Sequence, residues 1–166
     1  MDYQKAAAYW TEKDKTAVKM ERTALLEEME AFIHAHNTCA LATGFGEQIR
    51  CTPIEYTWMD QQFWMLSEGG KKFLGLEHNK NVCLAIFDPY TGFGKLGGMQ
   101  VEGVAEIIEP WSEQYLKLLA YKHIPAENLR KLPTEMHLIR VTPRHIDFLS
   151  AVLKEKGVST RQELSF

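Results

Sequence analysis

The sequence predicts a mainly β protein, a closed or split β-barrel of about six to seven antiparallel strands with flanking helices. Near residue 37 the apolar spacing changes from a helical period of about 3.6 to a strand period of 2. Short apolar segments then follow one another with turn residues between them. Strands and helices do not alternate regularly, so a doubly wound nucleotide-binding fold is not expected.

At 166 residues the chain has the length of one domain, and we assign residues 1–166 to it. Residues 1–36 form a helical N-terminal arm, in which residues 1–22 pack on a neighbouring chain or on the barrel and a helix runs from Thr23 to about residue 36. Residues 37–149 form the barrel. Residues 150–166 form a polar C-terminal tail with a weak helical tendency.

The barrel region contains seven segments with strand character, at residues 38–43, 49–58, 62–66, 82–87, 99–108, 136–142 and 145–149. A turn at Pro143-Arg144 separates the last two. Helices are expected at residues 73–78, 110–121 and 126–132. Residues 88–98 hold the densest cluster of glycine and proline and predict a shaped loop.

The charge balance excludes some classes of function. With 19 basic and 22 acidic residues the formal net charge is -3, which does not suit a nucleic-acid-binding surface. No apolar stretch reaches the length of a membrane span, and the first residues do not read as a signal peptide, so we expect a cytoplasmic protein. The patterns typical of hydrolases and kinases are absent.

Neither the cysteines nor the histidines predict a metal site. Cys39, Cys51 and Cys83 are widely spaced and are interpreted as small buried side chains. Among the six histidines only His34 and His36 are close in sequence, and residues two apart do not share a helical face.

The first candidate binding residues are Arg50 and Thr52, which share one face of a strand. A guanidinium group beside a hydroxyl suits a phosphate, although an exposed ion pair with Glu55 is the simpler interpretation of Arg50 alone. Pro53 cannot donate a backbone hydrogen bond, so this strand is either irregular or at an edge there, and in both cases a ligand can approach.

A second segment, Ser67-Glu-Gly-Gly-Lys71-Lys72, supplies a hydroxyl, flexible backbone amides and two cations at the start of a helix. A solvated charged turn explains this segment equally well by itself. The order of the two segments, joined by one hairpin, favours a shared anion site.

Gln100 follows the glycine-rich loop, and its amide can both donate to and accept from the edge of a heterocycle. Tyr90 and Phe93 of the loop are candidate walls for a flat ring, or interface residues. An ordinary surface position is the alternative for Gln100.

Taken together, these residues resemble the pyridoxamine 5'-phosphate oxidase-like, FMN-binding split-barrel family. The resemblance covers roughly residues 37–149 and rests on the following motifs: Arg50-Cys-Thr-Pro53, Phe63-Trp-Met-Leu-Ser67 running into Gly70-Lys-Lys72, Asn79-Lys-Asn-Val82 and Met99-Gln-Val101.

The resemblance implies a homodimer with two FMN sites at the subunit interface. Arg50, Lys71 and Lys72 would hold the phosphate, with Thr52 beside them, Ser67 would lie near the phosphate or ribityl chain, and Gln100 would meet the ring. The partner chain would complete each pocket, and Trp111 is predicted as one of its aromatic residues. A small-molecule substrate and a nicotinamide donor are the other partners expected.

The chain departs from the vitamin B6 oxidase at two places. Glu55 stands where the oxidase has a lysine five residues after the arginine, and the C-terminal segment lacks the oxidase's Trp- and Arg-bearing motif. Vitamin B6 oxidation is therefore not expected, and no catalytic side chain is assigned. An FMN-dependent oxidoreductase is the leading hypothesis, and the alternative is a non-catalytic flavin- or haem-binding protein on the same barrel.

Overall fold

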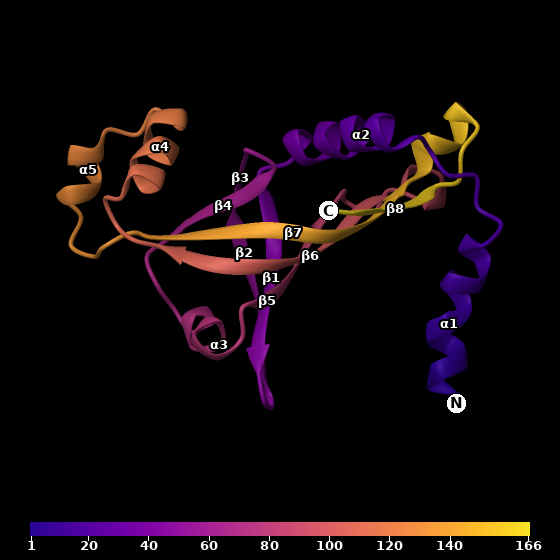
Figure 1. Cartoon of the computed structure of the whole chain (residues 1–166), viewed down its shortest axis with the longest axis horizontal. Coiled ribbons are helices and arrows are strands. Elements are labelled where there is room, and N and C mark those ends of the chain that lie inside the picture. Colours follow the sequence, from indigo (N-terminus) through magenta and orange to yellow (C-terminus); the bar gives the residue numbers. More distant parts are fainter.

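The computed structural model describes all residues 1–166, and its centre is one eight-stranded antiparallel sheet (Figure 1). The strands are β1 (Thr38–Phe45), β2 (Gln48–Glu55), β3 (Thr57–Met59), β4 (Gln62–Ser67), β5 (Asn81–Phe87), β6 (Gly97–Ile108), β7 (His137–Ser150) and β8 (Arg161–Ser165). Their order in the sheet is β2-β1-β5-β6-β7-β4-β3, with β8 paired to the second half of β7.

The strand order explains why the sheet curls. β2 and β3 lie at opposite ends of that order, yet only Tyr56 separates them in sequence. The two ends of the sheet must therefore approach each other, which gives the predicted split barrel. Tyr56 is buried, and its hydroxyl donates to the Ile33 carbonyl at 2.7 Å, which fixes this corner to a helix.

Five α-helices and two short 3₁₀ helices surround the sheet: α1 (Tyr3–Asp14), α2 (Arg22–Ala35), α3 (Lys72–His78), α4 (Glu113–Tyr121), α5 (Ala126–Arg130), η1 (Phe93–Lys95) and η2 (Ala151–Lys156). Leu25, Met29 and Ile33 of α2 are buried in the main core, which the inward residues of the strands complete. α4 and α5 lie at one end of the long axis and α1 at the other (Figure 1).

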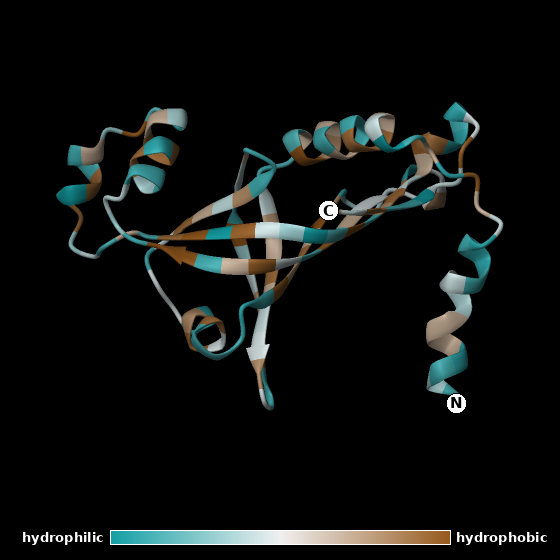
Figure 2. Ribbon diagram, in the orientation of Figure 1, coloured by the Kyte–Doolittle hydropathy of each residue, from teal (hydrophilic) through white to brown (hydrophobic).

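The hydropathy of α1 agrees with its position at the end of the molecule: the helix is largely hydrophilic (Figure 2), and none of its residues is buried. None of the helices combines the length and the apolar character that crossing a membrane requires.

Two features of the predicted strands are wrong. Residues 137–150 form one strand instead of two, because Pro143 lies at a bulge that the sheet accommodates: Gly103 pairs with Pro143 and Glu102 with His145, leaving Arg144 as the extra residue. The predicted strand 49–58 is interrupted at Tyr56 and becomes β2 and β3.

The C-terminal prediction missed a strand: η2 agrees with the weak helical tendency of the tail, but β8 was not predicted. Gln162 is buried, and it occupies a position of β8 where strands usually have an apolar residue. The alternation of apolar and polar residues that predicts a strand is therefore missing from the sequence here. Its amide bonds the Met20 amide (3.0 Å) and the Val18 and Ser159 carbonyls (3.1 and 2.7 Å), so β8 is tied to the segment before α2. The Glu21 side chain caps α2 by accepting hydrogen bonds from the amides of Thr23 and Ala24.

Candidate functional site

A cationic corner, formed by Arg50, Lys71 and Lys72, lies where β2 meets the start of α3. Arg50 and Thr52 pair with Thr43 and Leu41 of β1, so they point to the same face of the sheet as those two buried residues. α3 packs against β1 and β2. β2 is an edge strand, as Pro53 predicted, and a ligand can therefore reach this corner.

The turn between β4 and α3 shapes the corner. Gly69 and Gly70 have backbone φ values of 130° and 105°, which residues other than glycine rarely adopt. The Ser67 hydroxyl lies 3.2 Å from both the amide nitrogen and the carbonyl oxygen of Gly69. The Lys72 ammonium donates to the same carbonyl, so Lys72 folds back over the turn toward Ser67.

The three cations have no carboxylate partner. Lys72 is only 6% exposed, whereas Lys71 and Arg50 are exposed. Burial, and then the nearby Arg50 charge, lower the pKa of Lys72 from its usual 10.5. A buried ammonium group next to a second cation is unfavourable unless an anion joins them, so the corner is electrostatically incomplete.

Two hydroxyl groups at this corner also lack partners. Thr52 Oγ1 and Thr43 Oγ1 are buried without a hydrogen bond. Thr43 is a residue that sequence reasoning missed, because only the register of β1 and β2 shows that it pairs with Arg50. α3 approaches closely here: a Cβ on Gly75 would lie 3.3 Å from Thr43 Oγ1. Three cations and two free hydroxyls provide the donors that a phosphate group requires.

Gln100 lies on the other face of the sheet from the cationic corner. It pairs with Ala85, which pairs with Ala40, and these three residues share the outer face. Three strand spacings, about 14 Å, separate β6 from β2. One chain therefore does not bring Gln100 and Arg50 to the same surface. Gln100 lies near the start of β6, whereas Trp111 follows the end of this strand. The centres of the Trp111 and Tyr115 rings are 5.2 Å apart.

Most residues on the outer face of β2, β1 and β5 are small or apolar. A row of small side chains crosses these strands in register, running Pro53, Ala40 and Ala85 toward Gln100. Cys51 lies on the same face and is exposed, contrary to its interpretation as a buried side chain, whereas Cys39 is buried and Cys83 half-buried. Such a surface lets a flat molecule or another chain approach the backbone closely.

A cavity of about 230 Å³ contains Gln100, and Phe87, Asp147, Phe148, Leu149 and Arg161 also line it. Tyr90 and Phe93, the predicted walls, do not line this cavity, and both rings are exposed. A hydrogen bond between His36 Nε2 and Asp88 Oδ1, 3.0 Å apart, anchors the beginning of the loop that contains Tyr90 and Phe93.

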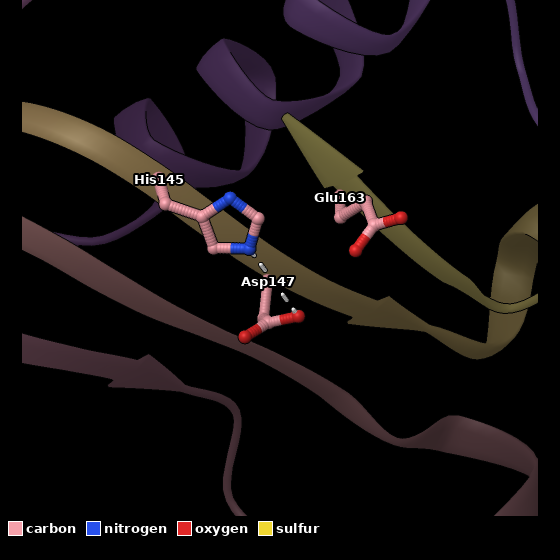
Figure 3. Close-up of side chains that lie close together, drawn as sticks. All are labelled: His145, Asp147 and Glu163. Carbon is pink, nitrogen blue, oxygen red and sulfur yellow. Dashed lines mark ion pairs between the residues drawn. The ribbon is translucent and has the colours of Figure 1, made fainter. Parts of the chain in front are cut away.

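His145, Asp147 and Glu163 gather on β7 and β8, and their potential ligand atoms lie within 4.8 Å of one another (Figure 3). Sequence spacing could not show this cluster, because Glu163 belongs to the strand that was not predicted. Each carboxylate already faces a cation: Lys19 is 3.2 Å from Glu163, and Arg161 is 3.6 Å from Asp147. The cluster is therefore close to electrically balanced without a metal ion.

Similar structures share the fold at low sequence identity. HutZ, the haem storage protein of Vibrio cholerae, is 18% identical, with a TM-score of 0.60 over 71% of this chain and 89% of that one. An FAD-binding protein of Mesorhizobium loti is 16% identical (TM-score 0.59, 72% and 89%). A putative pyridoxamine 5'-phosphate oxidase of Listeria innocua is 17% identical (0.59, 75% and 98%).

None of the curated protein sequences matches this chain significantly. The family model described as pyridoxamine 5'-phosphate oxidase matches residues 25–150. These residues include strands β1 to β7 and the cationic corner, but not β8. The chain belongs to the pyridoxamine 5'-phosphate oxidase family.

Proposed function

We propose that this protein binds FMN and acts as an FMN-dependent oxidoreductase on a small molecule. The observation that carries the proposal is the cationic corner, which combines three cations that have no carboxylate partner with the unpartnered hydroxyl of Thr52. FMN ends in a phosphate group, whose negative charge and oxygen atoms match these donors. The family match and a flavin-binding structural neighbour support a flavin as the ligand.

Each residue of the corner has a distinct role in this proposal. The guanidinium group of Arg50 binds two phosphate oxygens, and Lys72 neutralises charge from the buried side. Lys71 faces solvent and attracts the phosphate. Thr52 would donate its free hydroxyl, and Ser67, whose hydroxyl is hydrogen-bonded to Gly69, would lie near the phosphate or the ribityl chain.

The position of Gln100 supports a site shared by two copies of the chain. Gln100 and Arg50 lie on opposite faces of one sheet, so a second copy has to bring its own Gln100 face toward the ring of the bound flavin. The exposed apolar residues Ile49, Cys51, Pro53 and Phe87 on the outer face give the copies a surface to share. Trp111 remains a proposed contact from the second copy.

Bound FMN would supply the capacity to accept and donate electrons, and the protein would supply grip and orientation. The substrate is not expected to be a B6 vitamer. Lys122 donates to Glu55 at 2.8 Å, so an ion pair occupies the strand position where the oxidase has its lysine.

The absorption spectrum of the purified protein tests the proposal. We expect flavin absorption, FMN release on denaturation, and bleaching when a nicotinamide donor is added. Arg50→Ala should lose FMN during purification, whereas Arg22→Ala, which changes an exposed arginine on α2, should retain it. A colourless protein that FMN does not stabilise would exclude FMN binding.

The alternative is a protein on the same fold that binds a cofactor without catalysis. HutZ and a haem-binding protein of Mycobacterium smegmatis (15% identical, TM-score 0.56 over 71% of this chain and 50% of that one) have this fold. A Soret band in the purified protein would favour haem. Bound flavin that no nicotinamide donor reduces would favour storage or sensing.

A further inference from the structure

A second cavity, of about 540 Å³, lies between α1, the η1 loop and the beginning of β8. Its volume is within the range of small-molecule sites. Its apolar and aromatic wall consists of Trp10, Phe93, Leu96 and Leu149, and its charged side chains are Lys13, Asp14 and Arg161. Trp10, Lys13 and Arg161 all lie outside residues 25–150, so the family match does not include them.

Arg161 is the polar centre of this cavity. Its guanidinium group makes no hydrogen bond within the chain, and its Nε atom is buried without a partner. The nearest carboxylate oxygen, on Asp147, is 3.6 Å from its terminal nitrogen, too far for a strong hydrogen bond. The guanidinium carbon lies 4.7 Å from the centre of the Trp10 ring, so the aromatic face holds the cation in place.

The charges select the ligand. Lys13 and Arg161 contribute two positive charges to the lining and Asp14 one negative charge. Asp147, which does not line this cavity, offsets part of the Arg161 charge from 3.6 Å but accepts no hydrogen bond from the guanidinium group. A carboxylate offers two oxygens in a plane and matches the fork of a guanidinium group. Trp10 and Phe93 favour a flat apolar body beside that carboxylate.

We propose that this cavity binds a small aromatic monocarboxylate, with Arg161 holding the carboxylate and Trp10 contacting the ring. Arg161 and Leu149 also line the cavity that contains Gln100. The bound acid would therefore lie next to the position given to the flavin ring. The assignment of this ligand as the substrate rests on the proposed FMN function, whereas its binding does not.

Isothermal titration of the purified full-length protein with benzoate tests the inference, with benzamide as the uncharged analogue of the same shape. We expect benzoate to bind and benzamide to bind at least tenfold more weakly. Arg161→Gln should weaken benzoate binding by about tenfold to a hundredfold through loss of the charged hydrogen bonds. Arg161→Lys should restore part of the affinity, and Arg22→Gln should leave it unchanged.

Trp10→Leu keeps the test informative if the Arg161 variants do not fold, because Trp10 is 46% exposed and lies on a helix without buried residues. This variant should fold normally and lose most of the benzoate affinity. Equal binding of benzoate and benzamide, or unchanged binding by Arg161→Gln or Trp10→Leu, would overturn the inference. The titration needs no bound flavin, so failure to bind FMN and failure to bind benzoate are separate results.

Discussion

Replacing Lys72 by methionine should change cofactor affinity and stability in opposite directions. The buried ammonium group has one carbonyl partner and a neighbouring cation, Arg50, and both burial and that cation lower its pKa. Loss of the bond to Gly69 costs about 1 kcal/mol, and removal of an incompletely paired buried charge returns about 2 to 3 kcal/mol. We expect the flavin-free variant to be more stable by about 1 to 2 kcal/mol.

The pH dependence identifies the cause of that gain. Because the pKa of Lys72 is lower in the folded than in the unfolded state, the unfolded state binds the proton more tightly, and the stability of the native protein rises with pH. The destabilisation caused by the buried Lys72 charge is complete below the folded-state pKa of Lys72. It disappears above about 10.5, the pKa of this lysine in the unfolded state. The stability difference between Lys72→Met and the native protein should shrink over that interval.

Urea unfolding of the flavin-free proteins, followed by circular dichroism, measures the stability difference, and FMN and riboflavin titrations measure affinity. Lys72→Met should weaken FMN binding by about tenfold to a hundredfold, the value of one charged hydrogen bond, and should leave riboflavin binding nearly unchanged. The reasoning is refuted if the variant is less stable than the native protein at pH 7, or if FMN and riboflavin lose affinity equally.

Three further predictions concern other parts of the structure. A thiol reagent at pH 8 should modify Cys39 only after unfolding, since the thiol is buried and burial raises its pKa to about 12, whereas Cys51, exposed in a single chain, should react readily when the protein is monomeric and slowly when a second copy covers its face; mass spectrometry locates the label. Gly75→Ala should lower stability by about 1 to 3 kcal/mol in thermal melts, because its Cβ would lie 3.1 Å from a backbone nitrogen of β1, whereas Gly94→Ala, with open space around it, should not. Gln162→Leu should leave the Met20 amide and the Ser159 carbonyl without partners and speed hydrogen exchange in residues 16–21, and unchanged exchange would show that β8 does not anchor that segment.

The sequence predicted the barrel because short apolar segments of strand length follow one another with turn residues between them. The same rules failed at β8, where buried Gln162 replaces the expected apolar residue. They also failed at Pro143, which normally interrupts a strand but here lies at a bulge of a continuous one. Both errors depend on partners that are distant in sequence, which a local pattern does not contain.

The candidate site was predictable only where it depends on residues that are close in sequence. Arg50, Thr52, Lys71 and Lys72 lie in two neighbouring segments, and local spacing was sufficient to place them together. Gln100 was predicted to join them, but its face depends on the register of four strands, which the sequence does not reveal.

β2 has one further property, which concerns solubility. An edge strand exposes unpaired backbone groups to any extended chain, and repeated strand addition leads to aggregation. In β2, Pro53 offers no amide hydrogen and Arg50 and Glu55 carry charge, so a strand from another molecule would pair poorly along it. The strand that leaves its edge accessible to a small anion thereby also resists the uncontrolled growth of the sheet.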